Sequence, residues 1–94
     1  MAEKLTREFK LLNKYGMHVR PAGLFAKRAS QFDAEITVEK DGNVVSGKSI
    51  MALMTLEAVS GTVLKVTASG TDAEKCLDEL GALVERKFDI PDEQ

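Results

Sequence analysis

The chain has 94 residues, a length typical of a single domain with a modest hydrophobic core. Thirteen basic and fifteen acidic residues leave a formal net charge of −2, so no basic excess points to nucleic acid or to an anionic membrane surface. Hydrophobic residues make up 44% of the chain and charged residues 30%, which is typical of a globular protein rather than a disordered one.

The chain contains one cysteine, Cys76, and one histidine, His18. A single cysteine cannot form an internal disulfide, and one residue of each type is too few for a structural zinc site. We therefore expect neither a metal nor a cofactor. The first residues run directly into charged, alternating sequence, and no apolar run approaches the ~20 residues of a membrane span. We expect a cytoplasmic protein without a signal peptide or membrane insertion.

Hydrophobic periodicity predicts four strands and three helices in the order β-α-β-β-α-β-α. The strands are expected at residues 5–11, 34–40, 43–46 and 62–68, and the helices at about residues 19–32, 50–56 and 72–87. Asp41 and Gly42 predict a tight hairpin between the second and third strands. Four short amphipathic strands predict an α+β fold, in which an antiparallel sheet has helices on one face and solvent on the other. We expect one domain at residues 1–88 and a short acidic tail at residues 89–94.

Local residue chemistry predicts where each helix begins. Pro21 fits a helix only within its first turn, so the first helix is expected to start near His18, with His18 close to the N-cap. Ser49 is a plausible N-cap for the second helix. Residues 71–74, Thr-Asp-Ala-Glu, match a capping box for the third.

The position of His18 suggests phosphate chemistry. The first turn of a helix has backbone N–H groups without intrahelical partners and carries partial positive charge, so it is ready to bind phosphate. Arg20 adds a guanidinium group suited to phosphate oxygens, and a neutral imidazole is a competent nucleophile. A surface histidine or a silent cap is the alternative explanation. No second catalytic group flanks His18, so the pattern favours a phosphoryl relay over an enzyme with its own substrate pocket.

The predicted second helix is too apolar for a single buried stripe. If Leu53 and Leu56 face the core, then Ile50, Met51 and Met54 project elsewhere. We expect these three to be exposed and to dock partners, since methionine adapts to varied surfaces, although a larger core layer is the alternative. Three residues of the first helix, Gly23, Leu24 and Lys27, also fall outside its core stripe and are expected to extend this patch.

Residues 42–49, Gly-Asn-Val-Val-Ser-Gly-Lys-Ser, match the P-loop pattern literally. Context argues against nucleotide binding, because a P-loop runs as a loop from strand to helix. Here residues 43–46 read as a strand, and Gly42 belongs to a hairpin.

Two segments resemble the signatures of one known family. Residues 16–22, Gly-Met-His-Val-Arg-Pro-Ala, resemble the phosphorylation-site motif of HPr, the histidine-containing phosphocarrier of the bacterial phosphotransferase system. Residues 48–56, Lys-Ser-Ile-Met-Ala-Leu-Met-Thr-Leu, resemble that family's second signature, around a regulatory serine. The resemblance extends from about residue 5 to 88, with the elements in matching order.

This resemblance implies an open-faced β-sandwich, with three helices on one side of the sheet. It implies that His18 accepts phosphate on Nδ1 from phosphorylated enzyme I and passes it to an enzyme IIA component, while Arg20 assists at the phosphoryl group. The docking residues would be Ile50, Met51 and Met54. The protein would be a monomeric relay substrate of the phosphotransferase system rather than an enzyme.

The resemblance also raises a regulatory alternative. Ser49 aligns with the serine that HPr kinase/phosphorylase phosphorylates in some bacteria, so the chain is alternatively a regulatory interaction module. A cap at Ser49 is a sufficient structural role without such regulation. Residues 57–59, Glu-Ala-Val, replace a segment that commonly contains glycine in sugar-system members. This departure and the ending at residues 86–89 look more like NPr, the nitrogen-branch paralogue, which leaves the branch open between sugar transport and nitrogen-related regulation.

Overall fold

A computed structural model describes residues 3–91 of the chain. Within these residues it contains strands β1 (Glu3–Lys10), β2 (Glu35–Lys40), β3 (Asn43–Ser46) and β4 (Val63–Gly70), helices α1 (Val19–Ala29), α2 (Ile50–Met54) and α3 (Ala73–Glu85), and a last short turn, η1 (Lys87–Asp89). The predicted order β-α-β-β-α-β-α is confirmed. In this part of the chain, no helix is long and apolar enough to cross a membrane.

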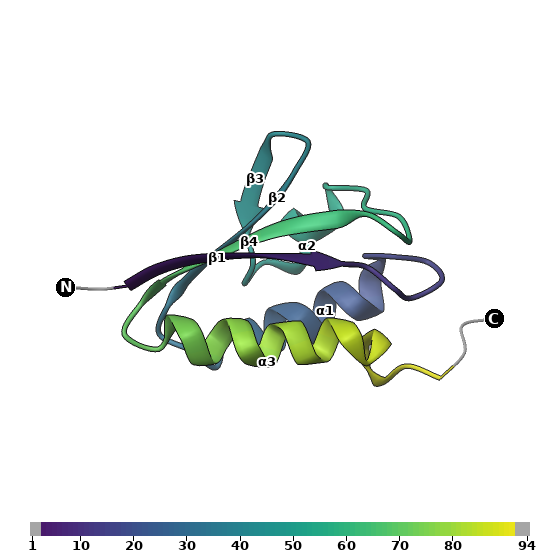
Figure 1. Ribbon diagram of the computed structural model, residues 1–94. Coiled ribbons are helices and arrows are strands. Elements are labelled where there is room, and N and C mark those ends of the chain that lie inside the picture. The colour runs from purple at the N-terminus through teal and green to yellow at the C-terminus, as the bar shows by residue number, and fades with distance from the viewer. Residues whose placement is uncertain (1–2, 92–94) are drawn as a thin grey trace.

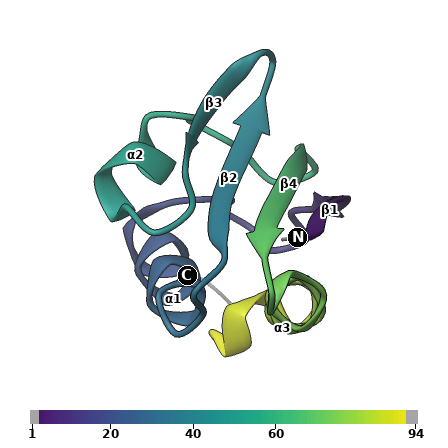
Figure 2. The ribbon, with the colours of Figure 1, turned by 90° about the vertical axis from the view of Figure 1, so that its left-hand side faces the viewer.

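The four strands form one antiparallel sheet in the order β1-β4-β2-β3. The helices α1 and α3 lie along one face of this sheet (Figure 1), and α2 lies beside α1, near β3 (Figure 2). The opposite face carries alternating polar side chains, as Thr6 and Thr67 illustrate by sharing a hydrogen bond of 2.9 Å there. The predicted α+β open-faced sandwich is therefore confirmed.

The core lies between the sheet and the helices. Alternate residues of each long strand face the helices because successive side chains of a strand point to opposite faces. Fully or nearly fully buried strand residues are Phe9, Ile36, Val38, Leu64, Val66 and Ala68, and those of α1 and α3 include Ala22, Phe25, Ala29, Leu77 and Leu80. Burial of each large side chain contributes about 1.5–3 kcal/mol, so this layer fixes how α1 sits on the sheet.

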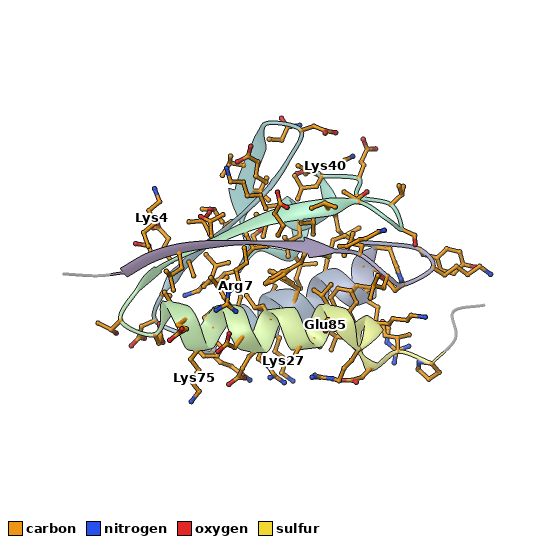
Figure 3. All side chains as sticks on the ribbon, in the orientation of Figure 1. Lys4, Arg7, Lys27, Lys40, Lys75 and Glu85 are labelled. Carbon is orange, nitrogen blue, oxygen red and sulfur yellow. The ribbon has the colours of Figure 1, made fainter. Side chains whose placement is uncertain are left out.

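Arg7 is the exception in the apolar pattern of β1, and the structure explains it. Its side chain lies between β1 and α3 and forms an ion pair with Asp78 of α3 (Figure 3). A second ion pair, Arg28 with Glu79 at 2.9 Å, joins α1 to α3. The first pair joins α3 to the sheet, and the second joins it to α1.

The predicted capping box at residues 71–74 is wrong. Asp72, not Thr71, is the N-cap residue of α3, and its side chain makes no capping hydrogen bond. Its two carboxylate oxygens instead accept hydrogen bonds from the backbone N–H groups of Asp33 and Ala34, both at 2.9 Å. The carboxylate thus ties the start of α3 to the segment leading into β2, a long-range contact that local pattern could not reveal.

The ends of the helices also differ from the predictions. Helix α1 ends at Ala29 and α2 at Met54, each before the predicted end. Helix α3 ends at Glu85 because Lys87, Phe88 and Asp89 take positive φ angles, which breaks the helix. Of the predicted acidic tail, residues 92–94 lie outside the described part, while Ile90 packs against the core.

The segment that matches the P-loop pattern is not a phosphate-binding loop. Residues 43–46 form β3, paired with β2, and Gly42 takes a φ of 85° in the hairpin turn. The ammonium group of Lys48 donates a hydrogen bond to the carbonyl of Phe32 at 2.8 Å. The ammonium group therefore makes a contact within the fold, between the segment after β3 and the segment after α1.

Candidate functional site

The backbone that leads to His18 is fixed to the segment following α2. Gly16 has a φ of 67°, and a Cβ at this position would lie 2.2 Å from the carbonyl oxygen of Ala58, so only glycine fits here. The N–H of Met17 donates to that same oxygen at 2.8 Å. The side-chain amide of Asn13 donates to the carbonyl of Gly16 at 2.7 Å. These contacts fix the backbone of the residues just before His18, at the start of α1.

His18 is the N-cap residue of α1, as predicted, with extended backbone angles (φ −87°, ψ −171°). Its carbonyl accepts the first helical hydrogen bond, from the N–H of Ala22 at 2.9 Å, but its side chain makes no capping hydrogen bond. The usual capping donors are the second and third helical N–H groups, and the third position here is Pro21, which has none. The imidazole is half-buried and is not used to cap the helix.

An aromatic ring packs against the imidazole. The rings of Tyr15 and His18 meet edge to face, with centroids 5.9 Å apart and planes at 85°. The ammonium group of Lys14 lies 5.2 Å from the centroid of the Tyr15 ring. Such aromatic pairs typically contribute ~0.5–1.5 kcal/mol, enough to favour one orientation of the imidazole.

The groups around the imidazole suit an anion. Val19 and Arg20 supply first-turn N–H groups, and the side chain of Arg20 is exposed. The chain's one thiol is no rival nucleophile: Cys76 is buried, and burial raises its pKa to about 11, so it stays protonated near neutral pH. Within residues 3–91, no group of three or more His, Cys, Asp or Glu residues is placed to hold a metal ion.

The apolar residues expected on the second helix face solvent. Met51 is 80% exposed, Ile50 and Met54 are 43% and 40% exposed, and Leu53 between them is fully buried. Gly23 of α1 lies across from Ile50, whose Cδ1 would be 3.9 Å from a Cβ at Gly23. We call the surface formed by Gly23, Ile50, Met51 and Met54 the α2 face.

The residues of α1 expected in the docking patch also border a pocket. Leu24 and Lys27, together with Arg20, line a pocket between α1 and the turn after α3. Sequence analysis also missed three exposed apolar residues near His18, namely Tyr15, Val19 and Val59. An aromatic residue in a loop beside the only histidine was the available signal for Tyr15. Val59 is distant from Gly16 in the sequence and lies beside it only in the folded chain, so the local sequence pattern could not indicate its place.

Ser49 is the N-cap residue of α2, as predicted. Its hydroxyl accepts a hydrogen bond from the N–H of Ala52 at 3.1 Å. Past the end of this helix, Glu57 takes a φ of 50°, a conformation that glycine adopts without strain. The ammonium group of Lys40 donates to the carbonyls of Leu56 and Glu57 at 3.0 and 3.3 Å, which holds the segment in place.

An open-faced sandwich that presents a histidine at the start of its first helix is suited to carrying a phosphoryl group. The family model described as "PTS HPr component phosphorylation site" matches residues 5–86 of the chain. The chain therefore belongs to the HPr family, the phosphocarrier proteins of the phosphotransferase system.

Relatives from several branches of this family are similar to the chain. The phosphocarrier protein HPr of Borreliella burgdorferi is 50% identical over 70 residues, which cover 74% of this chain and 81% of that protein. The phosphocarrier protein NPr of Shewanella violacea is 41% identical over 86 residues, covering 92% and 94%. A crystal structure of HPr from Thermoanaerobacter tengcongensis superposes with a TM-score of 0.85 at 42% identity, covering 95% of this chain and 98% of that one.

Proposed function

We propose that His18 accepts a phosphoryl group from enzyme I and passes it to enzyme IIA domains. The observation that supports this most directly is the placement of His18: it is the N-cap residue of α1, yet its imidazole makes no capping bond. His18 lies where a loop with a fixed backbone meets the start of α1. This position suits a side chain that presents phosphate to two successive partners. The cytoplasmic location expected from the sequence belongs to the same proposal.

The transfer is a displacement at phosphorus. The imidazole nitrogen of His18 forms a bond to phosphorus while the bond from phosphorus to the donor breaks and its electron pair leaves with the donor. The first-turn N–H groups of α1 and the guanidinium of Arg20 bind the phosphoryl oxygens. Each interaction with the helix end contributes only about 0.3–1 kcal/mol, which suits a group that must be released again. The onward step repeats the displacement with the partner's nucleophile.

The α2 face supplies the docking surface for this exchange. Its exposed methionines adapt to different partners, and Tyr15, Val19 and Val59 extend the apolar area toward His18. Leu24 and Lys27 of α1 extend this surface, and Lys27 and Arg20 attract partners with acidic rims.

The test of the relay is the variant His18→Ala, incubated with enzyme I and phosphoenolpyruvate. We expect an acid-labile phosphate on the wild-type chain and none on the variant, with the fold of the variant intact by circular dichroism. Phosphate retained by a folded His18→Ala variant would contradict the proposal. Lys75→Gln, an exposed change on α3, serves as a control that keeps full transfer.

A second proposal concerns Ser49, the residue that caps α2. A phosphate on its hydroxyl oxygen would still accept from the N–H of Ala52, so the helix tolerates the modification. The added charge lies beside Ile50 and Met51 and would repel acidic partners. The test is transfer by Ser49→Asp, which we expect to be several-fold slower, with Ser49→Ala as the control. Phosphate found only on histidine after exposure to HPr kinase/phosphorylase would count against this regulation.

The proposal also concerns the branch of the phosphotransferase system, sugar or nitrogen, and the oligomeric state of the chain. The related chains include HPr, NPr and an HPr-like protein Crh from Bacillus subtilis that is 40% identical. Solved relatives include a dimer of Thermoanaerobacter HPr and a domain-swapped Crh dimer. A monomer stays our prediction, and sedimentation velocity of the full chain tests it.

A further inference from the structure

A pocket of about 370 Å³ lies between α1 and the turn that follows α3. Four apolar side chains contribute to its lining: Leu24, Leu83, Phe88 and Ile90. Leu83 and Phe88 are almost completely buried, and the other two pack partly against the core. In Figure 2 the yellow turn after α3 lies between α1 and α3, where this pocket forms. The pocket's lining therefore combines an apolar part with a larger polar one.

The charged groups around the pocket are mainly cationic. Arg20, Lys27 and Arg28 of α1 border it, and Asp89 is the single carboxylate. Asp89 is paired with Arg86 at 3.0 Å, and Arg28 is paired with Glu79 at 2.9 Å. Within residues 3–91, Arg20 and Lys27 form no such pair. Two cations thus face the pocket without a described counter-charge, which favours an anionic occupant.

The wall of the pocket is a strained turn. Lys87, Phe88 and Asp89 have φ angles of 55°, 61° and 56°, a left-handed conformation that is unfavourable for residues with a Cβ. Burial of Phe88 and the hydrogen bonds from Arg86 Nε to the carboxylate of Asp89, at 3.0 and 3.1 Å, hold this conformation. This turn folds the chain back toward α1. Phe88 and Ile90 therefore line the pocket on the side opposite α1. Strain of this kind is concentrated at functional sites.

We propose that the pocket binds a small organic anion, a phosphate or carboxylate attached to a compact apolar group. The apolar group lies against Leu24, Phe88 and Ile90, and the anion pairs with Arg20 and Lys27. The volume is at the lower end of the roughly 300–1,000 Å³ of ligand pockets, which limits the occupant to a small molecule. One consequence rests on the proposed function: an anion in the pocket competes for Arg20 with the phosphoryl group on His18, and so slows transfer.

The binding test is an amide NMR titration of the full chain with phenyl phosphate. We expect saturable shifts at Gln31, Leu83 and Phe88, with weaker binding of inorganic phosphate and of phenol, because each supplies only one of the two recognised parts. Benzoate in a parallel titration shows whether phosphate or carboxylate is preferred. Absence of saturable shifts at millimolar ligand would overturn the proposal, and so would shifts confined to residues 15–20, since they would place the anion at the start of α1.

A matched pair of variants separates the pocket from general charge effects. Gln31→Glu places a negative charge at the pocket, and Lys75→Gln makes the same change in net charge near the other end of α3 (Figure 3). Both positions are exposed, so both variants are expected to fold. We expect Gln31→Glu to weaken phenyl phosphate binding roughly two- to five-fold and Lys75→Gln to leave it unchanged. Equal effects of the two variants would refute a site at this pocket.

The coupling to transfer has its own readout. At saturating phenyl phosphate, phosphorylation of the wild-type chain by enzyme I is expected to slow at least two-fold, and Gln31→Glu is expected to need a higher ligand concentration for the same effect. Unchanged transfer by a saturated wild-type chain would disprove the competition for Arg20. If instead His18 proved not to be phosphorylated at all, the proposed function would fail while the NMR titration still decided the pocket.

Discussion

The starts of α1 and α2 have similar backbone geometry, but their N-cap residues are chemically very different. His18 and Ser49 are both N-cap residues in extended conformation, and the carbonyl of each accepts the first bond of its helix. The hydroxyl of Ser49 also accepts the N–H of Ala52, whereas the imidazole of His18 makes no capping bond. Capping alone is sufficient to explain a serine at 49, but it does not explain a histidine at 18.

The third residue of each helix accounts for the difference. In α2 this residue is Ala52, whose N–H reaches back to the cap. In α1 it is Pro21, which has no N–H, so the side chain at position 18 is not drawn onto the helix. Pro21 therefore does more than mark the helix start: it removes one of the two usual capping donors for the side chain at position 18. Four predictions test this comparison.

The largest effect is expected from His18→Ser. Transfer of phosphate from enzyme I should fall by at least about a thousand-fold, because the nucleophile is removed. Stability should fall by no more than about 1.5 kcal/mol, because the edge-to-face contact with Tyr15 is lost while serine still suits an N-cap. Urea unfolding and phosphate incorporation measure the two quantities. A loss of more than about 2 kcal/mol would show that the imidazole has a structural role that the comparison denies.

The next effect concerns the ring that orients the imidazole. Tyr15→Ala should slow transfer by roughly two- to ten-fold, since an aromatic pair of this geometry contributes about 0.5–1.5 kcal/mol. Tyr15→Phe keeps the ring and should restore the rate to near that of the wild-type chain. Rates equal to wild type in both variants would mean that the edge-to-face contact does not position His18.

At the other cap the effect should fall on stability alone. Ser49→Ala removes the acceptor for the N–H of Ala52 and should cost about 1 kcal/mol of unfolding free energy. Phosphoryl transfer should be unchanged, because the methyl group leaves the α2 face intact. Ser49→Thr is the matched control, since it keeps a capping hydroxyl. Slower transfer by the folded alanine variant would give Ser49 a part in the relay that the comparison assigns to His18.

The sequence predicts those features that depend on contacts between residues close together in the chain, and it misses those that depend on distant residues. Pro21 constrains its own neighbours, so the start of α1 near His18 could be predicted from residues only three positions apart. The hydrogen bonds from the Asp33 and Ala34 N–H groups to Asp72 span almost forty residues, and the capping-box prediction failed there because local pattern does not include them.

The same limit explains why the sequence did not predict the pocket that Leu24 and Lys27 border. Helical spacing placed Leu24 and Lys27 outside the core stripe of α1, and they do lie outside it. They share that pocket with the turn at 87–89, whose left-handed backbone the propensities of Lys and Phe do not predict. Burial of Phe88 in the tertiary structure overrides the local preference, and this became visible only in the folded chain.

The smallest effect on stability should come from placing a proline at the third position of α2, where α1 has Pro21. Ala52→Pro removes the N–H that Ser49 accepts, at a first-turn position where α1 shows that proline fits. The lost cap costs about 1 kcal/mol, while the more rigid unfolded chain offsets about 0.4–1 kcal/mol, so the net loss should be at most about 0.5 kcal/mol.

The decisive measurement is the double variant. If the third residue determines whether a cap side chain matters, Ser49→Ala should cost about 1 kcal/mol in the wild-type chain and almost nothing beside Pro at 52, a coupling that a double-mutant cycle in urea measures directly. An undiminished cost in the proline background would mean that Ser49 stabilises α2 through another contact. The absence of a capping bond at His18 could then no longer be attributed to Pro21.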